Sequence, residues 1–226
     1  MKKVKIIGIS GKIGSGKDTF AEELAKIINF RENNRIADIN VNTTEFKVAE
    51  LKVEKYAFAD KLRENVQLIT GFEMSEILTH PFYNKIYTYT HEQKNTHLPL
   101  WDKTIGECLQ VMGTEAMREG FDYDVWVKSL FATHGEGCLK RDHIMVIADA
   151  RFPNEADYIL KQGGVVIRLE GDPMNVRANS TRDLNHISEI ALDDYKNFSR
   201  VVTNLDPDIG LFTDKIAQII NDFNIG

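Results

Sequence analysis

The sequence predicts an α/β fold of three layers, in which helices cover both faces of a parallel central sheet. Short runs rich in Val and Ile alternate with longer segments of helical period, which is the pattern of βαβ units. A glycine-rich loop lies directly between the first apolar run and the first helical segment. The chain of 226 residues is 42% hydrophobic, which is enough for one substantial core. We therefore predict a single domain over residues 1–226.

Five apolar runs are predicted to be the strands of the sheet. Strands of a parallel sheet are covered on both faces, so they form nearly continuous apolar runs instead of alternating with polar residues. The predicted strands cover residues 5–10, 53–59, 143–148, 165–169 and 200–203.

Six segments have the apolar spacing of helices. In the first, Phe20, Leu24 and Ile28 recur on one face. The second ends before Gly71, because glycine readily adopts the left-handed conformation that follows many helices. The predicted helices cover residues 18–29, 60–69, 105–112, 123–132, 154–162 and 211–223.

Three segments have no clear period. Residues 31–44 are polar and asparagine-rich, which indicates a surface insertion. Residues 73–102 are rich in Tyr, His, Thr and Pro and are expected to form a mobile or substrate-covering segment. Residues 171–185 form a third, polar loop.

Charge and composition exclude several classes of partner. The net charge of −6, with no basic cluster beyond Lys2 and Lys3, argues against a nucleic-acid polymer. No apolar run approaches the roughly 20 residues of a membrane span. Cys108 and Cys138 have neither a disulfide nor a metal-ligand spacing. We therefore expect reduced thiols and a cytoplasmic protein, in the host cytoplasm if the source is viral, that is a monomer or a homodimer.

The strongest chemical signal is the glycine-rich loop at residues 11–17. Its glycines allow backbone N–H groups to converge on phosphate oxygens, and the dipole of the following helix favours the same anion. A terminal lysine in this pattern reaches the β and γ phosphates of a nucleotide. A glycine-rich turn that merely caps a helix is the alternative. The candidate phosphate ligands are Gly11, Lys12, Gly14, Ser15, Gly16 and Lys17.

The residue after the loop lysine departs from the usual pattern. Asp18 stands where Ser or Thr ordinarily holds Mg²⁺, and Thr19 follows it. Both side chains offer hard oxygen ligands, the carboxylate directly or through water. The sequence leaves open which of the two contacts the metal.

A second signal follows the third predicted strand. Asp149 and Arg151 come at its carboxyl end, the edge at which open α/β sheets bind ligands. A carboxylate can accept a sugar hydroxyl or hold a metal-bound water, and a guanidinium can bind a phosphate with two parallel hydrogen bonds. The alternative is an ordinary helix cap and ion pair before the helix at Asn154.

Together, these motifs resemble those of the phage-type deoxynucleoside monophosphate kinases. The resemblance runs in order from residue 8 to about residue 206, and the ordered set is more specific than any later motif alone. The matching motifs are the loop through Thr19, Phe58-Ala59-Asp60-Lys61-Leu62-Arg63, Leu109-Gln110-Val111-Met112-Gly113-Thr114-Glu115, Val125-Trp126-Val127-Lys128, Asp149-Ala150-Arg151, His186-Ile187-Ser188-Glu189 and Val202-Thr203-Asn204.

The resemblance implies a P-loop nucleotide-kinase fold, ATP with Mg²⁺ as cofactors and a deoxynucleoside monophosphate as acceptor. It also implies an acceptor-covering helical region at about residues 60–128 and a lid at about residues 171–185. In one departure, Gly106 stands where family members often have an arginine, so a cationic contact is missing or supplied by Lys103. The implied acceptor residues are Leu62, Arg63, Gln110, Thr114, Arg118, Trp126, Asp149 and Arg151.

Several of these residues also have structural interpretations. Trp126 either packs in the core or stacks on a base, since an indole ring is suited to both contacts. The amide of Gln110 either contacts a base edge or is a satisfied buried group. In the third polar loop, Arg177 and Arg182 fit a lid that closes over phosphates, and a plain polar loop is the alternative. The predicted catalytic cations are Lys17, Arg151, Arg177 and Arg182.

Two other functions remain open at this point. Phosphomevalonate kinases of the animal type share the Ser-Gly-Lys-Asp loop and an Asp-x-Arg after a strand. A nucleotide-binding module that does not turn ATP over, or one that acts on polymeric DNA, is the second alternative, and the acidic charge balance disfavours DNA. The sequence does not indicate a base preference.

Overall fold

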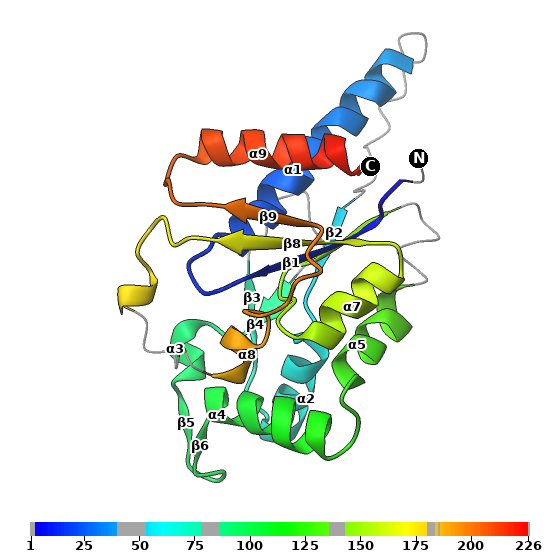
Figure 1. Cartoon of the computed structure of the whole chain (residues 1–226). Helices are drawn as coiled ribbons and strands as arrows, with labels where there is room; N and C mark the ends of the chain where they lie inside the picture. Colours follow the sequence, from blue (N-terminus) through cyan, green and yellow to red (C-terminus); the bar gives the residue numbers. More distant parts are fainter. Residues whose placement is uncertain are drawn as a thin grey trace.

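The computed structural model describes residues 3–39, 53–77, 86–135, 143–179, 184 and 186–225. These residues form three layers, with helices on both faces of a five-stranded sheet (Figure 1). Residues 40–44 of the expected insertion, residues 78–85, Cys138 and most of the lid beyond residue 179 lie outside the described residues.

The central sheet confirms the five predicted strands. They are β1 (Ile6–Gly11), β2 (Val53–Tyr56), β7 (Ile144–Ile147), β8 (Val165–Glu170) and β9 (Arg200–Thr203). All neighbours are parallel and their order is β2-β7-β1-β8-β9, so every carboxyl end lies at the same edge.

The second strand is shorter than predicted, and hydrogen bonds explain where it ends. The backbone N–H of Ala57 donates to the Asp60 carboxylate at 2.7 Å, and the N–H groups of Phe58 and Ala59 donate to Asp149 at 2.7 and 3.1 Å. Because these three backbone N–H groups donate to side-chain carboxylates and not to a neighbouring strand, residues 57–59 form a turn and not the end of the strand.

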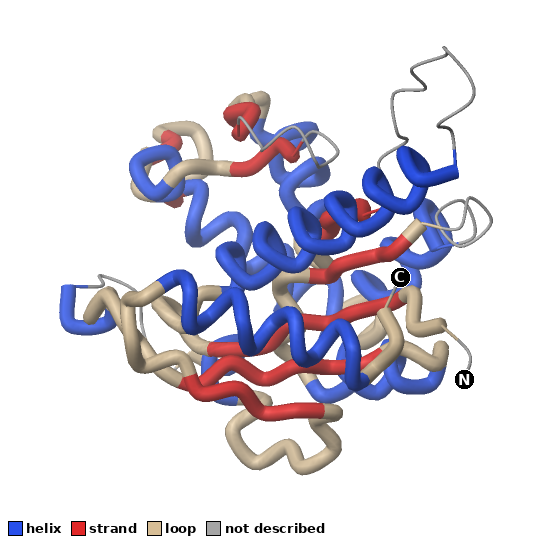
Figure 2. The backbone as a smooth tube through the Cα atoms, turned by 90° about the horizontal axis from the view of Figure 1, so that it is seen from above, coloured by secondary structure: helices blue, strands red, loops and turns tan. Residues whose placement is uncertain are grey.

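Two helical layers bury the two faces of the sheet. On one face lie α1 (Lys17–Ile39) and α9 (Ile209–Asp222), which cross above the strands in Figure 2. On the other lie α2 (Asp60–Thr70), α5 (Val125–Leu130) and α7 (Pro153–Lys161) (Figure 1).

Alternate residues of β1 serve the two cores. Ile7 and Ile9 join the cluster under α1 and α9, while Ile6 joins the cluster under α5 and α7. This is the period of two that a strand requires. A Cβ on Gly8 would lie 2.5 Å from the Cδ1 of Ile159, so glycine allows α7 to pack closely on the central strand.

Several helices extend beyond their predicted ends. The first continues through residues 31–39, a polar stretch that contains neither Gly nor Pro to end it. The predicted helix at 105–112 is α4 (Ile105–Gln110), which continues as a π-helix, η1 (Val111–Glu119). Likewise α5 continues as η2 (Phe131–Gly135). Single-sequence patterns do not distinguish α from π turns.

Residues 73–102 contribute short elements beside the main sheet. Strands β3 (Ser75–Ile77) and β4 (Ile86–Thr88) form one antiparallel pair. Strands β5 (His97–Leu98) and β6 (Lys103–Thr104) form another, and α3 (His91–Lys94) lies between the pairs in sequence. Figure 2 shows these strands set apart from the five-stranded sheet. Elements of two to four residues are too short to produce a periodic pattern.

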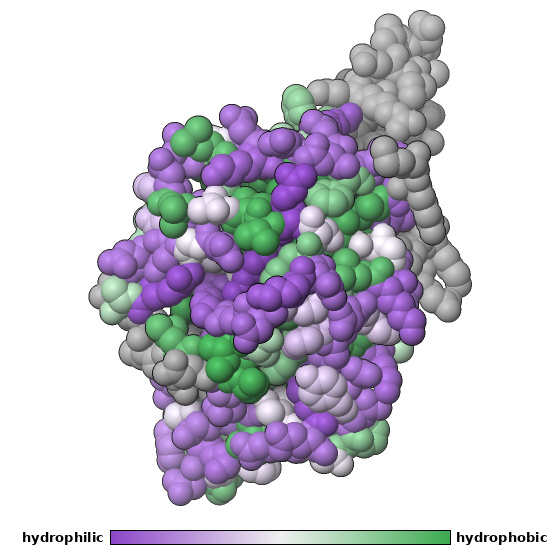
Figure 3. All heavy atoms as spheres, in the orientation of Figure 1, coloured by the Kyte–Doolittle hydropathy of each residue, from purple (hydrophilic) through white to green (hydrophobic). Residues whose placement is uncertain are grey.

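Two further short helices complete the described part, η3 (Arg177–Asn179) and α8 (Ile187–Ile190). Hydrophilic residues predominate on the face drawn in Figure 3, and apolar residues form scattered groups there. In the described part of the chain, no helix has the length and apolarity to cross a membrane.

Candidate active site

Among the residues that the structure describes, two neighbouring cavities are lined at the carboxyl edge of the sheet. The larger, of about 1140 Å³, is called the P-loop cavity because Gly14, Gly16 and Lys17 line it. Residues that follow all five strands also line it: Ile13, Ala57, Ala148, Pro173 and Asn204. The smaller, of about 480 Å³, is called the side cavity and is lined mainly by α2, α4, η1 and the segments after β7. This edge is where open α/β sheets bind ligands.

The two cavities share a border. Of the residues that the structure describes, those that line both cavities are Arg63, Lys94, Asp149 and Arg151. We call this set the junction. Three of its four members are cations, and they come from α2, from α3 and from the segment after β7. Such a border suits a group with several negative charges that passes from one cavity to the other.

The glycine-rich loop has the backbone that its glycines allow. Gly14 and Gly16 have φ of 78° and 88°, in the left-handed region that L side chains rarely adopt. A Cβ on Gly14 would also collide with the Asp172 carboxylate. From the end of β9, the Asn204 amide donates to the Ser15 carbonyl at 3.1 Å and supports the loop from below.

The loop lysine is folded back over the loop. Its Nζ donates to the carbonyls of Gly11 and Lys12 at 2.7 and 2.8 Å, so a phosphate has to replace these bonds. Ser15 is fully buried, and its Oγ has no hydrogen-bond partner within the described part of the chain.

Not every predicted loop residue lines the P-loop cavity. Gly14, Gly16 and Lys17 do, as do Asp18 and Thr19. Gly11, Lys12 and Ser15 do not, and the Lys12 ammonium turns away to an ion pair with Asp193 at 2.7 Å. Their role toward a phosphate stays a prediction.

Asp18 forms an ion pair with Lys55 in the P-loop cavity. The two atoms lie 2.6 Å apart, with the Asp18 side chain 78% exposed and the Lys55 side chain 12% exposed. Desolvation raises the pKa of Asp18, but the charge and hydrogen bond of Lys55, together with the charges of Lys17 and Arg63, lower it further, so the net pKa is lowered. The carboxylate is therefore ionised at neutral pH. Among the described residues, no group of three or more His, Cys, Asp or Glu side chains is placed to hold a metal ion.

Asp149 links the end of β7 to the start of α2. Both of its oxygens accept backbone N–H bonds, from Phe58 and Ala59, and so hold the turn that presents Leu62 and Arg63. The carboxylate borders both cavities while it performs this structural task.

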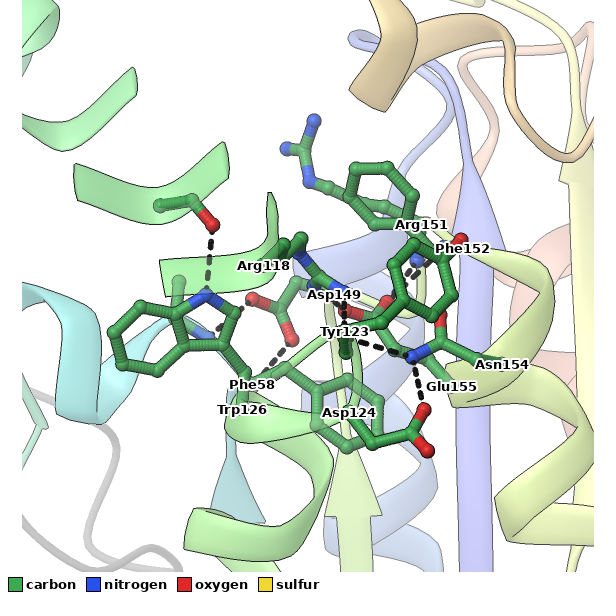
Figure 4. A network of polar contacts seen from close by, with 12 residues as sticks. Phe58, Arg118, Tyr123, Asp124, Trp126, Asp149, Arg151, Phe152, Asn154 and Glu155 are labelled. Atoms are coloured by element: carbon green, nitrogen blue, oxygen red, sulfur yellow. Dashed lines mark hydrogen bonds and ion pairs between the residues drawn. The ribbon is translucent and has the colours of Figure 1, made fainter. Parts of the chain in front are cut away.

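Arg151 lies at the junction with its guanidinium partly exposed. Its Nη1 donates to Glu189 at 2.5 Å, and 29% of its side chain is exposed. Figure 4 shows the guanidinium pointing away from the buried Arg118–Glu155 pair. A guanidinium has five N–H donors, so one ion pair leaves others for a phosphate.

Arg118 and Glu155 form a buried ion pair behind the side cavity. The two atoms lie 2.5 Å apart, and only 2% of the Glu155 side chain is exposed. The Arg118 guanidinium lies 4.1 Å from the centre of the Phe152 ring, and Glu155 also accepts the N–H groups of Arg151 and Phe152 (Figure 4). Burial raises the pKa of Glu155, against the opposing charge of Arg118. This network fixes the segment that carries Arg151.

Trp126 is mainly a core residue at the edge of the side cavity. It is 3% exposed, and its indole N–H donates to the Gly113 carbonyl at 2.9 Å (Figure 4). A Cβ on Gly113 would lie 2.9 Å from Leu62, so η1 packs closely on α2. Gln110 stands where α4 gives way to η1, a kind of irregularity that often marks functional sites.

The eight acceptor residues implied by the resemblance all line the side cavity. This set holds Leu62, Arg63, Gln110, Thr114, Arg118, Trp126, Asp149 and Arg151. Their roles toward a ligand stay predictions.

The described part of the lid approaches the glycine-rich loop. Arg177 donates from Nε to the Ile13 carbonyl at 2.9 Å and from Nη2 to the Gly171 carbonyl. Its predicted catalytic role stays untested, and it lines neither cavity. Met174 and Val176 line the P-loop cavity. Arg182 lies outside the described residues.

Sequence reasoning assigned no role to several cavity residues. Lys55 and Asp60 line the P-loop cavity, and Ser188 and Glu189 line the side cavity. The motif at 186–189 was a signal for the last two. The sequence contains no comparable signal for Lys94, because this residue lies in the segment 73–102, which has no clear period.

Comparisons with known proteins point to one family. The family model described as deoxynucleotide monophosphate kinase matches residues 34–216, so the match begins after the glycine-rich loop. A protein of Acanthamoeba polyphaga mimivirus with the printed name "Putative deoxynucleotide monophosphate kinase" is 27% identical over an alignment of 214 residues, and the match covers 88% of this chain and 88% of that protein.

Two solved structures are similar over nearly the whole chain. One is shikimate kinase from Bacteroides thetaiotaomicron, at 12% identity and a TM-score of 0.43, covering 97% of this chain and 98% of its own. The other is a sugar kinase from Janibacter sp. HTCC2649, at 15% identity and a TM-score of 0.42, covering 99% of this chain and 96% of its own. The strand order and the phosphate loop, and not these likenesses, define the fold.

Proposed function

Since this chain belongs to the deoxynucleotide monophosphate kinase family, we propose that it transfers the γ-phosphoryl group of ATP to a deoxynucleoside monophosphate. The products are ADP and a deoxynucleoside diphosphate, so the reaction would serve the supply of DNA precursors. A cytoplasmic location and a monomeric or homodimeric state stay predictions from the sequence.

The observation that carries the proposal is the junction between the two cavities. A kinase of this type must place the γ phosphate of the donor next to the single phosphate of the acceptor, and the cations of the junction line both cavities at their shared border. Phosphoryl transfer depends on positioning and on electrostatic stabilisation, and it needs no covalent intermediate on the protein.

The P-loop cavity suits the donor nucleotide. Gly14, Gly16 and the N-terminus of α1 offer backbone N–H groups, and the Lys17 ammonium would exchange the carbonyls of Gly11 and Lys12 for phosphate oxygens. The volume of the P-loop cavity, about 1140 Å³, is large enough for a nucleoside triphosphate.

The residues beside Lys17 fit a magnesium ion. The Asp18 carboxylate is ionised and the Thr19 hydroxyl is a neighbouring hard oxygen, and both line the P-loop cavity. Bound there, Mg²⁺ would neutralise charge on the donor phosphates. Asp18 would first leave its ion pair with Lys55 or share it.

The side cavity suits the acceptor. At about 480 Å³ it lies within the range of small-molecule sites, and Gln110 and Thr114 offer polar groups among apolar ones. With Arg63 and Arg151 holding the acceptor phosphate, one of its anionic oxygens attacks the γ phosphorus. The bond from that phosphorus to the bridging oxygen breaks, and ADP leaves with the electron pair.

A coupled assay of ADP release tests the proposal. The wild-type chain is supplied with ATP and Mg²⁺ and with dAMP, dCMP, dGMP or dTMP, with the ribonucleotides and phosphomevalonate as comparison acceptors. We expect kcat/KM to be highest for at least one deoxynucleotide, because a cavity closed around the sugar leaves a 2′-hydroxyl without a partner. Equal use of ribose and deoxyribose would defeat the sugar claim, and preference for phosphomevalonate would overturn the acceptor.

A further inference from the structure

We propose that Lys94 contacts the phosphates at the point where the two nucleotides meet, as a third cation of the junction beside Arg63 and Arg151. The inference rests on the proposed function and assigns a role to a residue outside every motif of the sequence. Lys94 is partly buried and lines both cavities. A cation in that position can reach a group that spans them.

The helix that carries Lys94 is short but firmly held. Thr90 caps it, and Gln93 completes a capping box with the Thr90 backbone. The Gln93 amide also donates to the Glu73 carbonyl at 3.1 Å and accepts the Ser75 hydroxyl at 3.2 Å. These bonds tie α3 to the β3–β4 hairpin, so the Lys94 backbone has a fixed place at the junction.

A second helix meets α3 closely beside Lys94. A Cβ on Gly106 would lie 3.1 Å from the Lys94 carbonyl oxygen, and the N–H of Ile105 donates to the Thr96 carbonyl at 3.1 Å. Gly106 lines the side cavity. Glycine at position 106 therefore lets α4 pack closely on the backbone of Lys94, which adds to the fixed position of α3.

Lys94, and not Lys103, is the lysine in place to act near Gly106. Lys103 is exposed on β6 and lines neither cavity. The sequence left two alternatives here, a missing cationic contact or one supplied by Lys103. Lys103 lies outside both cavity linings, and we assign the contact to Lys94.

Ion pairs hold the two junction arginines in position. Arg63 pairs with Asp60 at 2.6 Å, and Arg151 pairs with Glu189 at 2.5 Å. Each ion pair offsets part of the positive charge that a phosphate would meet. The phosphates of ATP and a deoxynucleoside monophosphate bring several negative charges together, so a cation from another element would add to their stabilisation.

The test compares Lys94→Met with Lys103→Met and Lys94→Arg. Steady-state rates are measured with ATP and the deoxynucleotide that the wild type uses best. Binding is measured by calorimetry for an adenosine–deoxynucleoside pentaphosphate, which spans both cavities, and for each mononucleotide alone. We expect K94M to lower kcat by about 10- to 100-fold and to bind the pentaphosphate at least about tenfold more weakly. Binding of the single nucleotides should change by less than about threefold, K103M should match the wild type, and K94R should recover most of the rate.

The outcomes separate the inference from the function on which it rests. A wild type that phosphorylates no deoxynucleotide overturns the proposed function and the role of Lys94 with it. An active wild type with K94M and K103M equal to it overturns Lys94 alone. Equal unfolding midpoints of K94M and K103M would exclude a fold defect. A lower unfolding midpoint for K94M, together with a loss of rate in K94R, would mean that Lys94 has a structural role and would overturn the inference.

Discussion

Arg151 and Glu189 form an ion pair, with Nη1 and Oε1 2.5 Å apart, that joins the segment after β7 to helix α8 at the border of the two cavities. Glu189 is buried, so its charge is held in place beneath the guanidinium. The pair fixes the orientation of Arg151 and leaves its other N–H donors for a second anion.

Replacement of Arg151 by Lys should therefore impair the acceptor side. An ammonium is a point charge and cannot bind Glu189 and a phosphate with the geometry of a planar fork. We expect the acceptor KM to rise and kcat to fall, with kcat/KM lower by about 10- to 100-fold, while the KM for ATP changes by less than about twofold. If ATP binding weakened and the acceptor KM did not change, Arg151 would belong to the donor side.

Lys17→Ala should remove transfer while it preserves the fold. The Lys17 ammonium donates to the carbonyls of Gly11 and Lys12, and water can satisfy these two acceptors in the variant. We expect kcat to fall by at least about 100-fold and the unfolding midpoint to stay within a few degrees of the wild type. Lys12→Ala is the matched control, because that side chain turns to Asp193, and it should keep most of the rate. Near-normal turnover by a folded K17A variant would contradict the prediction.

Asp18→Asn and Thr19→Val distinguish the two candidate metal ligands. Asp18 directly follows the loop lysine and carries the charge, so we expect the Mg²⁺ concentration for half-maximal rate to rise by about tenfold in D18N and by less than about twofold in T19V. Titration of the initial rate with MgCl₂ at saturating ATP gives both values. The reverse order would assign the metal to Thr19.

Glu155 should make the stability of the protein depend on pH. Burial raises its pKa to about 7 from an ordinary 4.5, so the folded state holds the proton more tightly than the unfolded state. Its contribution is therefore complete below about pH 4.5 and is lost as pH rises toward 7, by up to roughly 3 kcal/mol. Urea unfolding of the wild type and Glu155→Gln at pH 5 and pH 8 measures it, because glutamine does not titrate.

We expect the free energy of unfolding to fall more steeply between pH 5 and pH 8 in the wild type than in E155Q. Asp60, whose pKa burial raises to about 6, is present in both proteins and cancels in the comparison. Parallel profiles would mean that Arg118 and the two backbone N–H groups fully compensate the ionised carboxylate.

The sequence predicts features that depend on neighbours along the chain. The buried strands are visible because covering on both faces requires continuous apolar runs, and the loop around Lys17 is visible because its glycines and lysine are consecutive. The acceptor residues came from an ordered resemblance, and they do line one cavity.

Features that depend on distant contacts could not be predicted in this way. Arg118 meets Glu155 across 37 residues, and Lys12 turns to Asp193 across 181. The position of Lys94 depends on a capped helix of four residues between two small hairpins. None of these contacts leaves a periodic or local signal in the sequence.

Gln110→Leu tests whether the side cavity distinguishes between bases. Gln110 is the last residue of α4 before the π-helix, and it lines the side cavity among Leu62, Leu109 and Trp126. A carboxamide presents both donors and an acceptor, so it can discriminate between base edges, whereas leucine keeps a similar size without either.

We expect kcat/KM of Gln110→Leu to fall by about tenfold or more for the favoured base among dAMP, dCMP, dGMP and dTMP, while kcat/KM for the poorest acceptors changes little, so that the ranking changes. Leu109→Met is the control, because it alters an apolar lining residue of the same helix without adding or removing a polar group. A uniform loss across all four acceptors, together with a lower unfolding midpoint, would mean that Gln110 supports the α-to-π junction and does not contact the base.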